Sequence, residues 1–171
     1  GVDHLASILT ECKMISDRKG GGKPLLLKLS PDNTDDEIIA SAQMALRKGI
    51  DGFVATNTTL HRPVPRNAAS RSVFAESGGL SGRPLQARSN EIIRLLYEET
   101  QSTVPIVGVG GIDSVDTAWQ AVSSGASLLQ LYSALVFNGP SVVSGIVKGL
   151  KKRVKENGFL GIEEAVGLDI T

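Results

Sequence analysis

The sequence has a single cysteine, Cys12, and few aromatic side chains, which make up 4% of its 171 residues. One cysteine cannot form an internal disulfide, so the composition favours a reducing or redox-neutral compartment. No apolar run approaches the ~20 residues that a membrane-spanning helix needs. The 18 basic side chains balance 18 acidic ones, so nucleic-acid binding is not expected, because it usually requires a basic excess.

Metal-ligating residues are also scarce. The two histidines, His4 and His61, lie far apart, and the sequence has no cluster of Cys, His and Asp, so we expect no metal site. Hydrophobic residues at 41% and charged residues at 21% are typical of a soluble globular domain. The chain begins with Gly1, without a methionine or a signal pattern, and we expect it to be part of a longer protein.

Four short apolar runs predict β-strands at residues 25–29, 52–56, 104–109 and 127–132. Their apolar residues are nearly continuous, which is typical of parallel strands that are buried on both faces.

Helical patterns surround these runs. One precedes the first run, and another opens with a capping box from Thr34 to Glu37 and stops at Gly49. A third is marked by Ile92, Ile93, Leu95 and Leu96, a fourth begins at Ser114, and a fifth begins near Ser141.

This alternation predicts an α/β fold with a parallel sheet, because parallel strands need crossover connections. Four βα units form either a doubly wound sheet or half of an eight-stranded barrel, and composition does not decide between them. A complete barrel needs ~250 residues, so this chain cannot close one alone.

Residues 60–86 interrupt the alternation, and they are rich in Pro, Gly and Arg without a clear period. A loop of that length inside a domain is expected to be a lid or a binding loop. Five arginines in or beside it form a possible anion-attracting rim, although we expect most of them to be solvated: Arg62, Arg66, Arg71, Arg83 and Arg88.

A pair of glycines, Gly110 and Gly111, follows the third predicted strand and precedes the helix that Ser114 caps. Adjacent glycines let the backbone approach a phosphate closely, and free amides at a helix N-terminus attract the anion. Tyr132 and Ser133 follow the next strand, at the same rim of a parallel sheet. The alternative interpretation is a tight turn that needs glycine only for steric fit.

In combination, these motifs resemble the C-terminal half of dihydroorotate dehydrogenases, and the resemblance extends from Lys23 to the end of the chain. The residues after the second strand and the Gly-Gly-Leu-Ser-Gly segment favour the quinone-dependent class. The matching segments are KLSPD at 28–32, ATNTT at 55–59, GGLSGRPL at 78–85, VGGI at 109–112, LYS at 131–133 and EEAVG at 163–167.

The resemblance implies the C-terminal half of a TIM (β/α)8 barrel, with residues 1–171 as a single partial domain, and FMN as the cofactor. It assigns substrate binding, to dihydroorotate or orotate, to Asn57 and Thr58. It assigns cofactor binding to Lys28, Thr56, Ser81, Gly82, Gly110, Gly111, Tyr132 and Ser133. The alternatives are a lysine that extends from a strand end to solvent and a polar turn at residues 56–59.

The implied reaction oxidises dihydroorotate to orotate in pyrimidine biosynthesis and passes the electrons to a quinone. In this class the base is a serine from the first half of the barrel, which has no counterpart here, so we expect this chain alone to be inactive. We expect the full-length protein to associate with the bacterial or mitochondrial inner membrane, and this fragment to be soluble. Its exposed strand edges are expected to pair with the missing half or with a second copy.

Two other functions stay open. One is a different FMN-dependent barrel oxidoreductase, although such families typically carry a catalytic histidine or cysteine on a late loop. The other is a non-catalytic half-barrel that binds a phosphorylated ligand or a partner chain.

Overall fold

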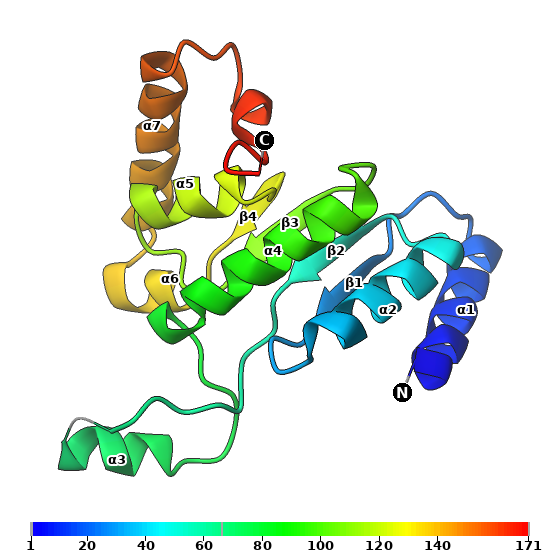
Figure 1. Ribbon diagram of the computed structural model, residues 1–171, viewed down its shortest axis with the longest axis horizontal. Coiled ribbons are helices and arrows are strands. Elements are labelled where there is room, and N and C mark those ends of the chain that lie inside the picture. The colour runs from blue at the N-terminus through cyan, green and yellow to red at the C-terminus, as the bar shows by residue number, and fades with distance from the viewer. Residues whose placement is uncertain (1, 66, 171) are drawn as a thin grey trace.

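A parallel four-stranded sheet forms the centre of the computed structural model, which describes residues 2–65 and 67–170 (Figure 1). The strands lie side by side in chain order, and each pairs with the one before it. The strands are β1 (Leu26–Leu29), β2 (Gly52–Ala55), β3 (Ile106–Val109) and β4 (Leu128–Gln130).

Helices connect the strands as the sequence predicts. The longer ones are α1 (Val2–Arg18), α2 (Asp35–Arg47), α4 (Gln86–Thr100), α5 (Val115–Ser123) and α7 (Ser141–Glu156). The shorter ones are α3 (Ala68–Phe74), α6 (Ser133–Asn138) and the 3-10 turns η1 (Arg83–Leu85) and η2 (Ile162–Ala165).

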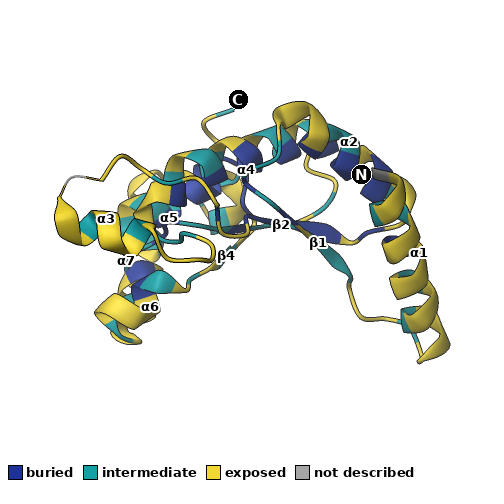
Figure 2. Cartoon of the chain, turned by 90° about the horizontal axis from the view of Figure 1, so that it is seen from below, coloured by how far each residue is buried: buried dark blue, intermediate teal, exposed yellow. Residues whose placement is uncertain are grey.

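The sequential strand order decides between the two folds that the sequence left open. A doubly wound sheet reverses its strand order and carries helices on both faces. Here the order is not reversed, and α2, α4 and α5 cover one face of the sheet (Figure 2). That arrangement is a half-barrel.

The predicted helix start at Thr34 is confirmed. The Thr34 hydroxyl accepts a hydrogen bond from the Glu37 amide at 3.3 Å, and the Thr34 amide donates to the Glu37 carboxylate at 2.9 Å. Gly49, with φ at +74°, follows the end of the same helix, in a conformation that suits glycine.

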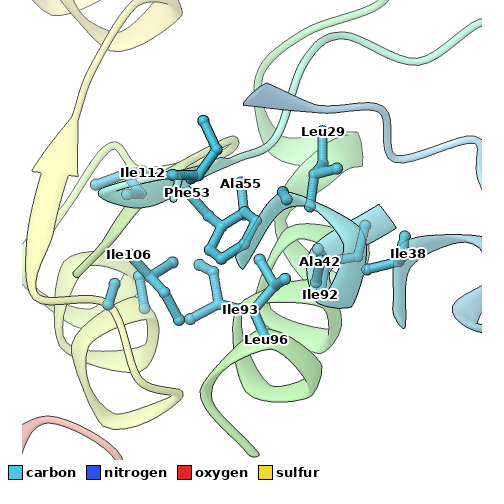
Figure 3. Packing of buried hydrophobic residues seen from close by; sticks show 14 of the residues in the cluster. Leu29, Ile38, Ala42, Phe53, Ala55, Ile92, Ile93, Leu96, Ile106 and Ile112 are labelled. Atoms are coloured by element: carbon cyan, nitrogen blue, oxygen red, sulfur yellow. The ribbon is translucent and has the colours of Figure 1, made fainter. Parts of the chain in front are cut away.

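The core lies between the sheet and the three covering helices (Figure 3). Phe53 from β2, Ile106 from β3, and Ile92 and Leu96 from α4 are at most 1% exposed. Each such side chain contributes roughly 1.5–3 kcal/mol through the removal of apolar surface from water.

The other face of the sheet is open, and here the expectation of burial on both faces is wrong. Residues paired across parallel strands point to the same face, so Lys28, Val54, Val107 and Leu128 form one row. Lys28 is exposed, and Leu128 is 60% exposed, because no described helix covers this face. Since the side chains of a complete barrel point inward from this face, it is the interior face of the half-barrel.

Residues 60–65 and 67–79, which we call the arm, project from the body of the molecule (Figure 1). We expected no regular structure in this stretch, yet it contains α3, which Asn67 and Ser70 cap reciprocally. The prediction missed this helix because it has seven residues and buries none of them, so it leaves no periodic pattern.

Candidate functional site

The carboxyl ends of the four strands surround a cleft of about 840 Å³. Each of the ten residues assigned to cofactor or substrate lines this one cleft: Lys28, Thr56, Asn57, Thr58, Ser81, Gly82, Gly110, Gly111, Tyr132 and Ser133. They come from segments that are far apart in the sequence and converge because parallel strands end at a common rim. Their individual roles stay predictions.

Residues 80–83, which we call the strap, form the outer wall of the cleft. The strap is fastened to the turn after β2 by two backbone hydrogen bonds between Leu80 and Thr59, at 2.7 and 3.1 Å. The hydroxyls of Ser81 and Ser133 lie 2.8 Å apart, which joins the strap to the first residue of α6.

The last fastening of the strap is an ion pair. Arg83 Nε donates to Asp113 Oδ2 at 2.6 Å, which ties the strap to the loop between β3 and α5. The hydrogen bond and the negative charge of Asp113 raise the pKa of Arg83 above its ordinary value. Both residues line the cleft, and sequence reasoning gave no role to Asp113, which follows the glycine pair without a motif of its own.

The need for glycine at positions 110 and 111 arises from steric contacts with residues outside the cleft. Gly111 has φ at +72°, and a Cβ there would lie 2.6 Å from Gln86 Cβ. A Cβ on Gly110 would lie 2.2 Å from Ser89 Oγ. The first turn of α4 therefore requires glycine at both positions, so the steric interpretation accounts for the residue type.

The amides of the same loop are nevertheless open to a ligand. Within residues 2–65 and 67–170, the amides of Gly110, Gly111 and Ile112 donate no hydrogen bond. The amides of Asp113 and Ser114, by contrast, both donate to Thr117 Oγ1, at 2.9 and 3.0 Å. The expectation that the start of α5 supplies free amides is therefore wrong at those two residues, and residues 110–112 carry the open donors instead.

Lys28 brings a positive charge to the open face of the sheet. None of the ion pairs among the described residues includes it, so the ammonium group is available to a ligand in the cleft.

The polar residues after β2 divide into two kinds. Thr56 is 3% exposed, and its hydroxyl lies 3.0 Å from Ser89 Oγ and donates to the Asn57 carbonyl at 3.0 Å. Asn57 and Thr58 are exposed, and their side chains have no hydrogen-bond partner in the part of the chain that the structure describes. The Asn57 amide donates to the Leu29 carbonyl at 2.8 Å, which holds this turn against β1.

Asp32 anchors the same turn from the loop after β1. Its carboxylate accepts hydrogen bonds from the Thr59 hydroxyl and from the Leu60 amide, the latter at 2.8 Å. Desolvation raises the pKa of Asp32, but these two hydrogen bonds and the electrostatic influence of His61 and Arg62 outweigh it. The pKa therefore lies below its usual value of 3.8.

Two of the five arginines, Arg62 and Arg88, donate hydrogen bonds to backbone carbonyls and so differ from the solvated side chains that we expected for most of the five. Arg62 donates to the Thr59 carbonyl at 3.1 Å and to the Gly78 carbonyl at 2.5 Å, and so closes the base of the arm. Arg88 donates to the carbonyls of Pro31 and Asn33, at 3.2 and 2.8 Å. Arg71 is exposed, and Arg66 lies outside the described residues.

The comparisons with known proteins agree with the motifs. The sequence model of the family described as Dihydroorotate dehydrogenase matches residues 2–154. The chain belongs to the dihydroorotate dehydrogenase family. This membership decides against the other barrel oxidoreductases that the sequence left open.

Curated relatives named Dihydroorotate dehydrogenase (quinone) include proteins from Trichodesmium erythraeum and Natronomonas pharaonis. The first is 41% identical over 170 residues, which cover 97% of this chain and 44% of that protein. The second is 43% identical over 168 residues, which cover 98% of this chain and 45% of that protein. The chain thus spans less than half the length of these relatives, and it matches their C-terminal half.

Two crystal structures of DHODH from Eimeria tenella resemble this chain. A complex with ferulenol has a TM-score of 0.88 at 32% identity, over 99% of this chain and 49% of that one. A ligand-free form has a TM-score of 0.77 at 36% identity, over 85% of this chain and 39% of that one. Since DHODH is a TIM-barrel enzyme, these likenesses confirm the half-barrel fold.

We predict that Gly111→Ala destabilises the protein by about 2 kcal/mol more than Gly158→Ala, as measured by urea denaturation. The two glycines have similar φ, +72° and +75°, so both substitutions strain the backbone. Only at Gly111 does the new Cβ collide with a neighbour, whereas nothing lies within 4 Å at Gly158. Equal losses would contradict the steric role assigned to α4.

We predict that Asp32→Asn lowers stability at neutral pH by about 1 kcal/mol, because solvent screening limits the hydrogen bonds of a partly exposed carboxylate. The folded-state pKa is lowered, so the stabilisation is fully present above the unfolded value of about 3.8 and is lost as the pH falls through the folded pKa. Urea denaturation at pH 7 and pH 3 measures this difference. Asp17→Asn removes a charge without such bonds, and a similar loss there would contradict the assignment.

Proposed function

We propose that residues 1–171 are one partial domain of an FMN-dependent dihydroorotate dehydrogenase that oxidises dihydroorotate to orotate with a quinone as acceptor, in pyrimidine biosynthesis. The observation that carries this proposal is the convergence of the ten assigned residues on one cleft, in a chain of that family.

The residues of the cleft suit FMN. Its volume of about 840 Å³ lies in the range of sites that hold cofactors and other small molecules. The open amides of residues 110–112 and the hydroxyl of Ser133 suit the phosphate, because anions bind backbone N–H groups and hydroxyls in such concave turns. Lys28 lies on β1, away from this loop, where its charge suits the electron-rich ring.

FMN supplies hydride acceptance when it is bound. Lys28 would hold the ring from β1, and its positive charge would favour the reduced form, because a cation stabilises negative charge on a neighbouring group. Asn57 and Thr58 orient the substrate, since a carboxamide both donates and accepts and thus complements the flat polar edge of a pyrimidine acid.

We place the catalytic base on the half of the barrel that this chain does not include, as the resemblance implies. The two serines of the cleft, Ser81 and Ser133, bond to each other across the wall assigned to the cofactor. The unpaired outer edges of β1 and β4 and the open face of the sheet fit that other half as the partner.

The quinone and the membrane belong to the full-length protein in this proposal. No helix within residues 2–65 and 67–170 combines the length and the apolarity that crossing a bilayer requires. We therefore propose that attachment to the bacterial or mitochondrial inner membrane occurs through other parts of the protein. Groups of three or more metal-ligating side chains are also absent from those residues, and a site without metal stays a prediction.

We predict that the chain binds FMN and that Lys28→Met weakens this binding by roughly tenfold, because methionine keeps the length of the side chain and removes its charge. Quenching of flavin fluorescence measures the affinity. Lys48→Met, at the end of α2 and outside the cleft, is the matched control and is expected to bind FMN like the wild type. A wild-type chain that binds no FMN would contradict the proposal.

We predict that the chain alone, supplied with FMN and dihydroorotate, reduces a dye acceptor slowly. Addition of the N-terminal half of a curated relative is expected to raise this rate at least ~100-fold, because general-base assistance contributes about 10²–10⁴ in rate. Bleaching of the dye measures the rate. Fast turnover by the chain alone would refute the absence of the base without affecting the FMN prediction.

A further inference from the structure

The cleft contains a carboxylate beside the loop that the proposed function assigns to a phosphate. Asp113 is the one acidic residue among those that line the cleft, and its side chain is 18% exposed. It follows Gly111 and Ile112, whose amides are open. A carboxylate in this position repels a phosphate dianion, and partial burial strengthens the repulsion because water screens it less.

Arg83 is the cation that offsets this charge. Its Nε donates to Asp113 Oδ2 at 2.6 Å, while Lys28, the other cation of the cleft, lies two strands away on β1. The remaining nitrogens of Arg83 have no acceptor among the described residues, and its side chain is 81% exposed. Arginine stays protonated at every physiological pH, so Arg83 keeps a positive charge beside the carboxylate.

We propose that Arg83 is a positioning residue that, by neutralising and holding Asp113, makes the cleft select phosphorylated over unphosphorylated flavin. The proposal rests on the proposed function, in which the cleft holds FMN. Arg83 acts through Asp113, and the open amides of residues 110–112 make the contacts to the phosphate. A purely structural role, in which the ion pair only fastens the strap, would affect every flavin equally.

Titration of the chain with FMN and with riboflavin, which lacks the phosphate, separates these roles. The wild type is expected to prefer FMN. Arg83→Gln is expected to weaken FMN binding by about tenfold and to leave riboflavin binding unchanged, since an uncompensated charge opposes only the anionic ligand. The double variant Arg83→Gln with Asp113→Asn is expected to regain FMN affinity to within about threefold of the wild type.

Two further variants keep the test decisive. Arg47→Gln removes an exposed arginine at the far end of α2 and is expected to behave as the wild type. Arg83→Lys keeps the charge and is expected to retain the preference for FMN, and it replaces Arg83→Gln if thermal unfolding shows that the glutamine variant does not fold.

The outcomes distinguish this inference from the proposed function. The neutralising role is refuted if Arg83→Gln changes the affinity for neither flavin, lowers both affinities equally, or is not rescued by Asp113→Asn. In each case FMN binding by the wild type still upholds the proposed function. If the wild type binds neither flavin, the proposed function fails and this inference fails with it.

Discussion

Parallel pairing of four consecutive strands is the constraint on which the rest of the structure depends. The register places Leu29 beside Ala55, Ala55 beside Gly108, and Gly108 beside Leu129, so the strands end close together. Every loop that leaves a strand end therefore opens at one rim. The cleft exists because the pairing brings five distant segments to that rim, and none of them forms a binding site alone.

The one-sided covering of the sheet is the second consequence. The apolar contacts that stabilise the chain lie between the strands and α2, α4 and α5, whereas the row from Lys28 to Leu128 faces away from those helices. A closed barrel of this family buries that face against its other strands. The open face that makes Lys28 accessible to a ligand thus also leaves apolar side chains such as Leu128 exposed.

Polar groups around the cleft are divided between support and availability. Some polar side chains form hydrogen bonds with neighbouring backbone and side chains and so fix the turns; these are Thr56, Asp32 and Arg88. The side chain of Asn57 and the backbone amides of residues 110–112 have no hydrogen-bond partner among the described residues, and the Lys28 ammonium group has no ion-pair partner there. Hydrogen-bond donors that have no protein partner and are held by fixed turns suit a polar, anionic ligand, because they need no rearrangement when the ligand binds.

The sequence alone determined the order of the strands and the longer helices, the caps at Thr34 and Ser114, and ten of the residues that line the cleft, because these features depend on hydrogen bonds within a few residues or on motifs of a recognisable family. Only the tertiary structure showed that α4 forces glycine at positions 110 and 111, and that the strap is fastened by Ser81 to Ser133 and by Arg83 to Asp113. Those partners are 52 and 30 residues apart, and nothing local signals which side chains meet once the strand ends converge. The open face was equally hidden, because the nearly continuous apolar runs of these strands are typical of burial on both faces.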